Sequence, residues 1–129
     1  MDINSNLFGI YLHSKRNEKG FTLRELSEVA GISHVYLYKM ECGKKPPPND
    51  ALLIKMALCL QLNNDEKDLF FDIAATTKQL SNSKNHQLPA DIKLYLFKTK
   101  EAQKFVREAS KINLSDDYWK ELLSCLKNL

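Results

Sequence analysis

Several residue types that mark particular protein classes are scarce in this sequence. It has three cysteines, four glycines and four prolines among 129 residues. The cysteines are far apart and lack a Cys-x-x-Cys spacing, and the histidines are equally scattered, so we predict no disulfide framework, no metal site and no cofactor. Glycine and proline are too few for a collagen-like or low-complexity chain.

Long apolar runs are absent as well. No stretch approaches the roughly 18 consecutive apolar residues of a membrane span. Residues 1–6 are mostly polar, with no basic region ahead of an apolar run. A glycine-rich phosphate loop and a paired nucleophile and base are also missing. We therefore expect a cytoplasmic protein that is not an enzyme, with no catalytic residue and no membrane partner.

The composition itself is that of an ordinary globular protein. Apolar residues make up 43% and charged residues 27%, with 19 basic and 16 acidic side chains and a net charge of +3. This composition excludes wholesale disorder, and the length predicts one domain, at most with an extension. The mild positive charge permits nucleic-acid binding without demonstrating it.

The pattern of apolar residues predicts an all-α protein. They recur at three- and four-residue steps, as in amphipathic helices, whereas strand-like alternation is absent. The expected helices cover about residues 4–18, 22–30, 33–42, 50–60 and 63–78, begin again at Pro89, cover about 100–110 and begin again at Ser115. The helix over 50–60 is apolar nearly all round and is expected at the centre of the domain. The polar stretch 81–87 is predicted to be a loop or hinge.

Capping residues indicate where the helices begin. Residues Thr22 to Glu25 have the pattern of a capping box, and Ser33 and Asn49 are N-cap candidates. Only about three residues around Gly31 separate the second helix from the third. Two short helices joined in this way form the helix-turn-helix geometry, in which the second helix is offered to the DNA major groove.

Between positions 20 and 44 the chain contains Gly-Phe-Thr-Leu-Arg-Glu-Leu-Ser, then Gly-Ile-Ser, then Leu-Tyr-Lys-Met-Glu-Cys-Gly-Lys. These residues resemble the lambda-repressor-like, xenobiotic-response-element (XRE) family of prokaryotic and phage regulators. The matching positions are Gly20, Thr22, Leu26, Gly31, Ile32, Ser33, Leu37, Glu41, Gly43 and Lys44. Ser27 and Met40 stand where the family usually has Ala and Ile. The resemblance covers about residues 6–75.

The resemblance implies a fold and a function. The fold is expected to be a five-helix lambda-repressor-like DNA-binding domain over residues 1–80, with a C-terminal helical extension over 88–129. The expected function is a sequence-specific double-stranded DNA-binding transcriptional regulator, foremost a dimeric repressor of its own or a neighbouring operon. The alternative is an antitoxin or a phage-encoded inhibitor of a host defence enzyme, whose C-terminal part binds a protein while the helix-turn-helix autoregulates.

A helical wheel divides the helix over 33–42 into two sides. At about 100° per residue, the apolar positions 37 and 40 point to one side. The opposite arc holds His34, Val35, Tyr38, Lys39 and Cys42, and the first four of these are the candidate base-reading residues. Lys39 can donate to guanine O6 and N7, His34 can donate to a purine N7 or a phosphate, and Val35 can pack on a thymine methyl. The base-contacting positions of the family map onto the same three residues.

Contacts with the DNA backbone are predicted at the edges of this arc. The beginning of the second helix offers amides and a positive dipole end to a phosphate. The two lysines after the third helix can follow the backbone, or merely keep the proline turn soluble. The predicted backbone residues are Thr22, Leu23, Arg24, Ser33, Tyr36, Lys44 and Lys45. The tyrosines of the third helix can instead stack on their own domain. The family often has Gln where this chain has Leu23, so that side-chain contact is lost or moves to Arg24.

Two charged residues are assigned to structure rather than to DNA binding. In the resemblance, an arginine of the first helix pairs with the glutamate near the end of the reading helix. These residues are Arg16 and Glu41 in this chain. Their pairing is expected to determine how the two helices cross.

The extension needs something to cover its aromatic and leucine side chains. It is predicted to form two or three helices that pack on the first domain or on a second copy. Since two reading helices about 34 Å apart require a dimer interface, we expect a homodimer on a double-stranded DNA operator. A protein partner of the C-terminal helices is the alternative.

Positive charge is densest outside the motif. Residues 1–60 carry eight basic and six acidic side chains, a net of +2, whereas residues 78–111 carry eight and three, a net of +5. The helix residues involved are Lys98, Lys100, Lys104, Arg107 and Lys111. They form either a solvated face or a surface for additional DNA backbone or an acidic partner.

Overall fold

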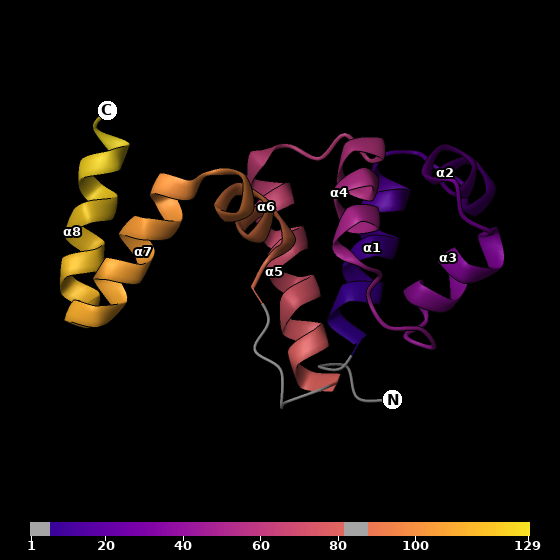
Figure 1. Ribbon diagram of the computed structural model, residues 1–129. Helices are drawn as coiled ribbons and strands as arrows, with labels where there is room; N and C mark the ends of the chain where they lie inside the picture. Colours follow the sequence, from indigo (N-terminus) through magenta and orange to yellow (C-terminus); the bar gives the residue numbers. More distant parts are fainter. Residues whose placement is uncertain (1–5, 82–87) are drawn as a thin grey trace. The chain divides into compact units, whose positions relative to one another are not determined.

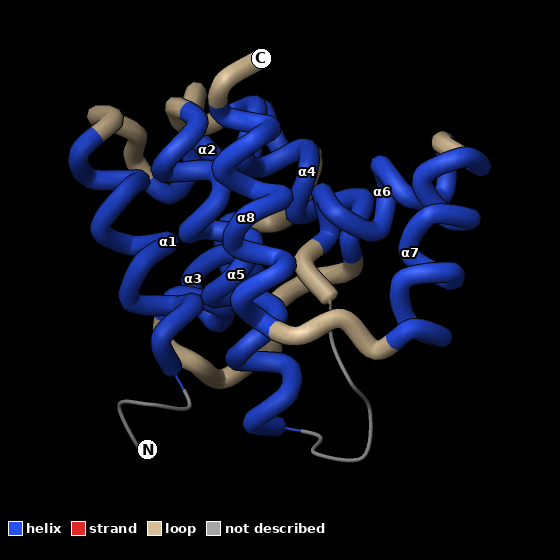
Figure 2. Tube along the Cα trace, turned by 90° about the vertical axis from the view of Figure 1, so that its left-hand side faces the viewer, coloured by secondary structure: helices blue, strands red, loops and turns tan. Residues whose placement is uncertain are grey.

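The computed structural model describes residues 6–81 and 88–129. Every regular element in these residues is a helix, as the blue segments of Figure 2 show, which confirms the predicted all-α class. In chain order (Figure 1) the helices are α1 (Leu7–Glu18), α2 (Leu23–Ala30), α3 (His34–Glu41), α4 (Asp50–Cys59), α5 (Asn64–Ser81), α6 (Ala90–Lys98), α7 (Lys100–Ile112) and α8 (Asp116–Lys127). Most of the predicted hinge over 81–87, and the predicted beginning of the first helix at residue 4, lie outside the described residues.

The chain divides into two compact units, Met1–Lys93 and Leu94–Leu129. The division falls inside α6, whereas the sequence suggests a boundary at the hinge before it. The first turn of α6 belongs to the first unit because Ala90 is buried in its core and Lys93 pairs with Asp50 of α4 at 3.1 Å.

Local capping bonds begin α2, α3 and α4 at the predicted residues. The Thr22 hydroxyl accepts from the amide of Glu25 at 3.1 Å, and the Glu25 carboxylate accepts from the amide of Thr22 at 3.3 Å. The side chains of Ser33 and Asn49 each accept from an amide three residues further on, at 3.1 and 2.9 Å. Gly31 ends α2 with a φ of 73°, a left-handed conformation that favours glycine and allows the tight turn into α3.

The core of the first unit is formed by the inner faces of α1 to α5. Its largest fully buried side chains are Phe8, Phe70, Leu12, Leu26, Leu37, Met40, Leu53, Met56 and Leu60. The ring of Phe70 on α5 lies 5.4 Å from that of Phe8 on α1, centroid to centroid. Helix α4 is only partly buried, because Leu58 faces solvent on its outer side. Both α1 and α2 contact α3, so the third helix is held from two directions.

The second unit is a pair of amphipathic helices with very little interior. The Phe105 ring of α7 meets the Trp119 ring of α8 edge to face, with centroids 6.3 Å apart. Among residues 94–129 only Ala109 is buried, while Phe97 is 81% exposed. None of the helices in the described part of the chain is long and apolar enough to cross a membrane.

Candidate nucleic-acid interface

The outer face of α3 brings the predicted base-reading residues together. His34, Val35, Tyr38 and Lys39 are all exposed, and we call these four residues the reading surface. On the opposite side of the same helix, Leu37 and Met40 are buried against the core. The helical wheel therefore predicts correctly which side chains face outward. The surface offers a cation, an imidazole, a phenol and an apolar branched side chain, the groups that major-groove base edges can meet.

Tyr38 and Cys42 interact along the outer side of α3. Hydrogen bonding with Cys42, one helical turn away, is the main reason that the pKa of Tyr38 is raised above its ordinary value. The phenol therefore remains a neutral hydroxyl at physiological pH, able to donate or accept. Tyr36, by contrast, is half-buried and packs against the core. Its position favours stacking on its own domain.

A groove of about 640 Å³ lies between α3 and the proline turn. It is lined by Ser33, Val35, Tyr36, Lys39, Lys45, Pro46, Pro47, Pro48 and Asn49. The chain returns toward α3 there because the amides of Lys44 and Lys45 both donate to the Lys39 carbonyl, at 2.8 and 3.2 Å. Lys39, Lys44 and Lys45, all three exposed, therefore lie close together along the chain at the end of the reading surface. This arrangement concentrates positive charge beside the exposed face of α3, which suits contact with anionic groups such as phosphates.

The beginning of α2 offers less to a phosphate than the sequence suggests. The amide of Thr22 is donated to Glu25 within the capping box, so it is not free for an external anion. The Glu25 carboxylate also adds negative charge at this helix end. The Leu23 side chain packs against the core, whereas Arg24 is exposed. Of these residues, only Arg24 has an exposed, positively charged side chain.

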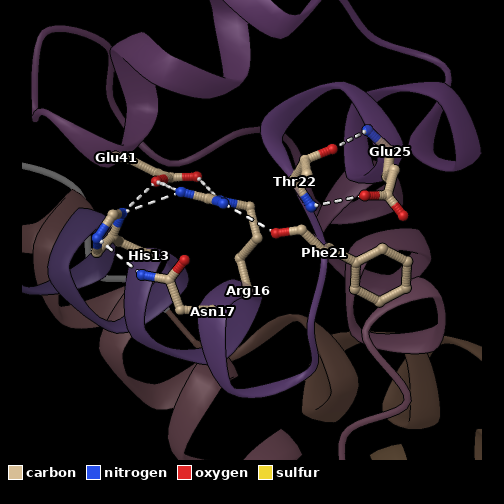
Figure 3. Close-up of polar contacts among 7 residues, drawn as sticks. All are labelled: His13, Arg16, Asn17, Phe21, Thr22, Glu25 and Glu41. Carbon is tan, nitrogen blue, oxygen red and sulfur yellow. Dashed lines mark hydrogen bonds and ion pairs between the residues drawn. The ribbon is translucent and has the colours of Figure 1, made fainter.

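A buried ion pair joins α1 to the end of α3 (Figure 3). Arg16 Nε donates to Glu41 Oε2 at 2.8 Å, and Arg16 Nη2 donates to Glu41 Oε1 at 3.0 Å. Arg16 Nη1 donates to the Phe21 carbonyl at 2.9 Å, which ties the loop before α2 to the same group. Arg16 and Glu41 are 7% and 8% exposed. The structure therefore places the pair inside the protein, at the end of α3.

Sequence reasoning missed His13 as a member of this network. His13 Nδ1 lies 2.6 Å from Glu41 Oε1, and its Nε2 lies 3.0 Å from Asn17 Nδ2 (Figure 3). Because the Glu41 carboxylate can only accept, Nδ1 donates to it, although Arg16 Nη2 also lies 3.2 Å from Nδ1, and Nε2 is then free to accept from Asn17. The sequence does show one indication of this contact. His13 precedes Arg16 by three residues and so shares its face of α1.

Gly9 is a second residue that the sequence analysis left unassigned. A Cβ placed on it would lie 2.5 Å from the Met40 carbonyl oxygen and 2.6 Å from that of Glu41. These are backbone atoms, so any side chain at this position would push α1 away from the end of α3. A lone glycine inside a helical pattern is the signal for such a close approach.

Comparisons with known proteins cover the segment that contains α2 and α3. Residues 12–64 match the model of a family described as helix-turn-helix. A solved structure titled SinR protein/SinI protein complex is similar at 23% sequence identity over 93% of this chain and 94% of that chain, with a TM-score of 0.43. No curated protein matches the chain.

Proposed function

We propose that this chain is a DNA-binding transcriptional regulator of the XRE-type helix-turn-helix family, and that it acts as a sequence-specific dimeric repressor. The match of residues 12–64 to the helix-turn-helix family model supports this assignment. The operator of the repressor would lie in double-stranded DNA upstream of its own or a neighbouring operon. One observation carries the proposal. The reading surface is exposed on α3 while the end of α3 is joined to α1 through Arg16 and Glu41. A rigidly held helix with an exposed polar face suits insertion into the major groove.

We assign base reading to four side chains of α3. Lys39 donates to guanine O6 and N7, His34 donates to a purine N7 or a phosphate, and Val35 packs on a thymine methyl. Tyr38 adds a neutral hydroxyl. We assign contacts with the DNA phosphate backbone mainly to the side chains of Arg24, Lys44 and Lys45. Lesser backbone contacts are assigned to Thr22, Leu23, Ser33 and Tyr36.

The second unit is the proposed dimer interface. A unit shorter than about 40 residues rarely buries enough surface to be stable without a disulfide, a metal or an oligomer. Its apolar groove of about 460 Å³ is lined by Phe105, Trp119, Leu122, Leu123, Cys125, Leu126 and Leu129. A second copy of the same hairpin would cover this groove with equally apolar side chains. Dimerisation would also supply the two reading helices that a two-fold operator requires.

Binding to DNA from immediately upstream of its own gene tests the proposal. In a mobility-shift titration the full-length chain should prefer this DNA over a scrambled competitor of the same composition. The Lys39→Ala variant should bind about 5- to 150-fold more weakly and lose discrimination at one base pair, because one good base contact contributes about 1–3 kcal/mol. Its melting temperature should not change, since Lys39 is exposed.

The matched control is Lys120→Ala, which removes the same charge from an exposed position on α8. It should retain the preference for the upstream DNA. Equal affinity of the wild-type chain for upstream and scrambled DNA would contradict sequence-specific regulation.

A second candidate function is favoured by the same exposed apolar hairpin. The second unit could bind a different protein, as in an antitoxin or an inhibitor of a defence enzyme, while the helix-turn-helix autoregulates. The oligomeric state separates the two candidates. A chain that is monomeric in solution at micromolar concentration, yet specific for its DNA, would favour the partner-binding function.

A further inference from the structure

Helix α7 carries a row of positive charge that the helix-turn-helix does not use. Lys100, Lys104, Arg107 and Lys111 follow one another at steps of four, three and four residues along one continuous helix. That spacing places all four on the same face of an α-helix. Each of them is exposed. We call these four residues the basic stripe.

The stripe is turned away from the face by which α7 packs on α8. That face includes Phe105, which meets the Trp119 ring, and Ala109, which is buried. At about 100° per residue, Phe105 and Ala109 lie about 140° and 180° around the helix from Lys100. Packing on α8 and contact through the stripe can therefore occur together.

Two acidic residues of α7 neutralise the basic stripe only in part. Glu101 pairs with Lys104, and Glu108 pairs with Lys111, each at 3.1 Å. These side chains are 65–83% exposed, and exposed pairs of this kind contribute less than about 1 kcal/mol. An external anion can displace them at little cost. Even with both glutamates counted, the four basic residues retain a net charge of +2.

We propose that the basic stripe binds the phosphate backbone of double-stranded DNA as a second, sequence-independent contact of this chain. The stripe extends over about 16 Å of helix, at about 1.5 Å per residue. Over that length one DNA strand presents about five phosphates. A row of four cations can thus meet several phosphates of the same duplex, and its binding releases condensed counterions.

Two observations favour DNA over an acidic protein as the occupant. Residues 1–60, which contain the reading surface, carry a net charge of only +2, so the stripe would supply much of the phosphate attraction. The stripe also belongs to the same chain as α3, which raises the effective concentration of phosphates once α3 is bound. This tethering step rests on the proposed function, whereas the contact between the stripe and DNA does not.

The salt dependence of DNA binding tests the proposal. The full-length chain and the variant K100Q/K104Q/R107Q/K111Q are titrated by fluorescence anisotropy against a random-sequence duplex over a series of salt concentrations. The variant should bind at least about tenfold more weakly, with a slope of log K against log salt less steep by about 2 to 4, because each lost phosphate contact lowers it by about 0.9.

The matched control is K55Q/K67Q/K120Q/K127Q, which makes the same change in net charge outside the stripe and the reading surface. Its slope should change by less than about 1. Equal slopes for the stripe variant and the control would overturn the proposal. A stripe variant that loses affinity for polyglutamate but keeps its affinity for the duplex would also overturn it, in favour of an acidic partner.

Two further measurements keep the outcome unambiguous. Circular dichroism checks folding, and if the fourfold variant is unfolded, K100Q/R107Q replaces it, with an expected slope change of about 2. Lys39→Ala is also measured on the upstream and the scrambled DNA. If α3 does not read sequence, this variant discriminates between upstream and scrambled DNA no differently from the wild type. The effect of the stripe on random DNA would persist in that case.

Discussion

At the scale of single residues, Arg16 contributes most to holding the end of α3 against α1. Its guanidinium bonds both oxygens of the buried Glu41 carboxylate. Arg16→Ala should lower the free energy of unfolding by about 3–5 kcal/mol, because it leaves a buried charge without its main partner. His13 lies 2.6 Å from the same carboxylate and remains as a partner, so the loss of stability should be near the lower end of this range. Thermal and urea unfolding measure the effect.

Two further variants test whether the unpaired charge of Glu41 causes the loss of stability in Arg16→Ala. Arg24→Ala, which removes an exposed arginine, should change the stability by no more than about 0.5 kcal/mol. The double replacement Arg16→Met with Glu41→Leu should recover most of the lost stability, since an apolar pair leaves no charge buried. An unchanged melting temperature in Arg16→Ala would contradict a structural role for the pair.

Single residues also show how far the site could be predicted. The outward arc of α3 follows from the helical period alone, because position on a helix determines which side a residue faces. His13 was missed because its partner Glu41 is 28 positions away. Contacts at that separation depend on how α1 crosses α3, which spacing within one helix does not reveal.

At the scale of the elements, a network of charges stabilises the beginning of α5. Glu66 accepts from the amide of Asn63 at 2.9 Å and pairs with Lys15 and Lys19 of α1, at 2.9 and 3.0 Å. The backbone bond from Asn63, followed by the two lysines, lowers the pKa of Glu66 from 4.5 to about 2. The carboxylate therefore caps α5 and joins it to α1 in its charged form.

This pKa predicts a specific acid sensitivity. Because the folded-state pKa lies below the ordinary value, the charged carboxylate stabilises the fold fully above about pH 4.5, and this contribution is lost as the pH falls toward 2. Glu66→Gln should therefore be less stable than the wild type at neutral pH, and the difference should shrink in acid. Urea unfolding at pH 7, 4 and 2.5 measures it. Glu101→Gln, an exposed carboxylate on α7, controls for net charge, and a difference independent of pH would contradict the assignment.

The elements themselves were predictable to different degrees. The beginnings of α2, α3 and α4 follow from Thr22, Ser33 and Asn49, because a cap bonds an amide only three residues away. The end of α5 was predicted near Lys78 but lies at Ser81, since no glycine or proline marks it. The buried share of α4 was overestimated because Leu58 is apolar yet faces solvent. Burial depends on which neighbours the fold supplies, and composition does not specify them.

At the scale of the whole molecule, the proposed regulation requires that two copies associate. The proposed interface predicts that the wild-type chain sediments as a dimer at micromolar concentration. Leu122→Glu, on the apolar groove of α8, should raise the dimer dissociation constant by at least about 30-fold, because disrupting a central apolar contact costs about 2 kcal/mol or more. Analytical ultracentrifugation measures the shift.

The polar side of the same helix provides the control for that substitution. Ser124→Glu adds the same charge at an exposed position that lies outside the groove, so it should leave the dimer intact. The Leu122→Glu chain should also lose more affinity for an operator with two half-sites than for a single half-site, because only the former needs both reading helices on one duplex. Equal dissociation constants for the two variants would place the dimer contact elsewhere. The apolar groove of the second unit would then be available to a different protein, as the alternative function requires.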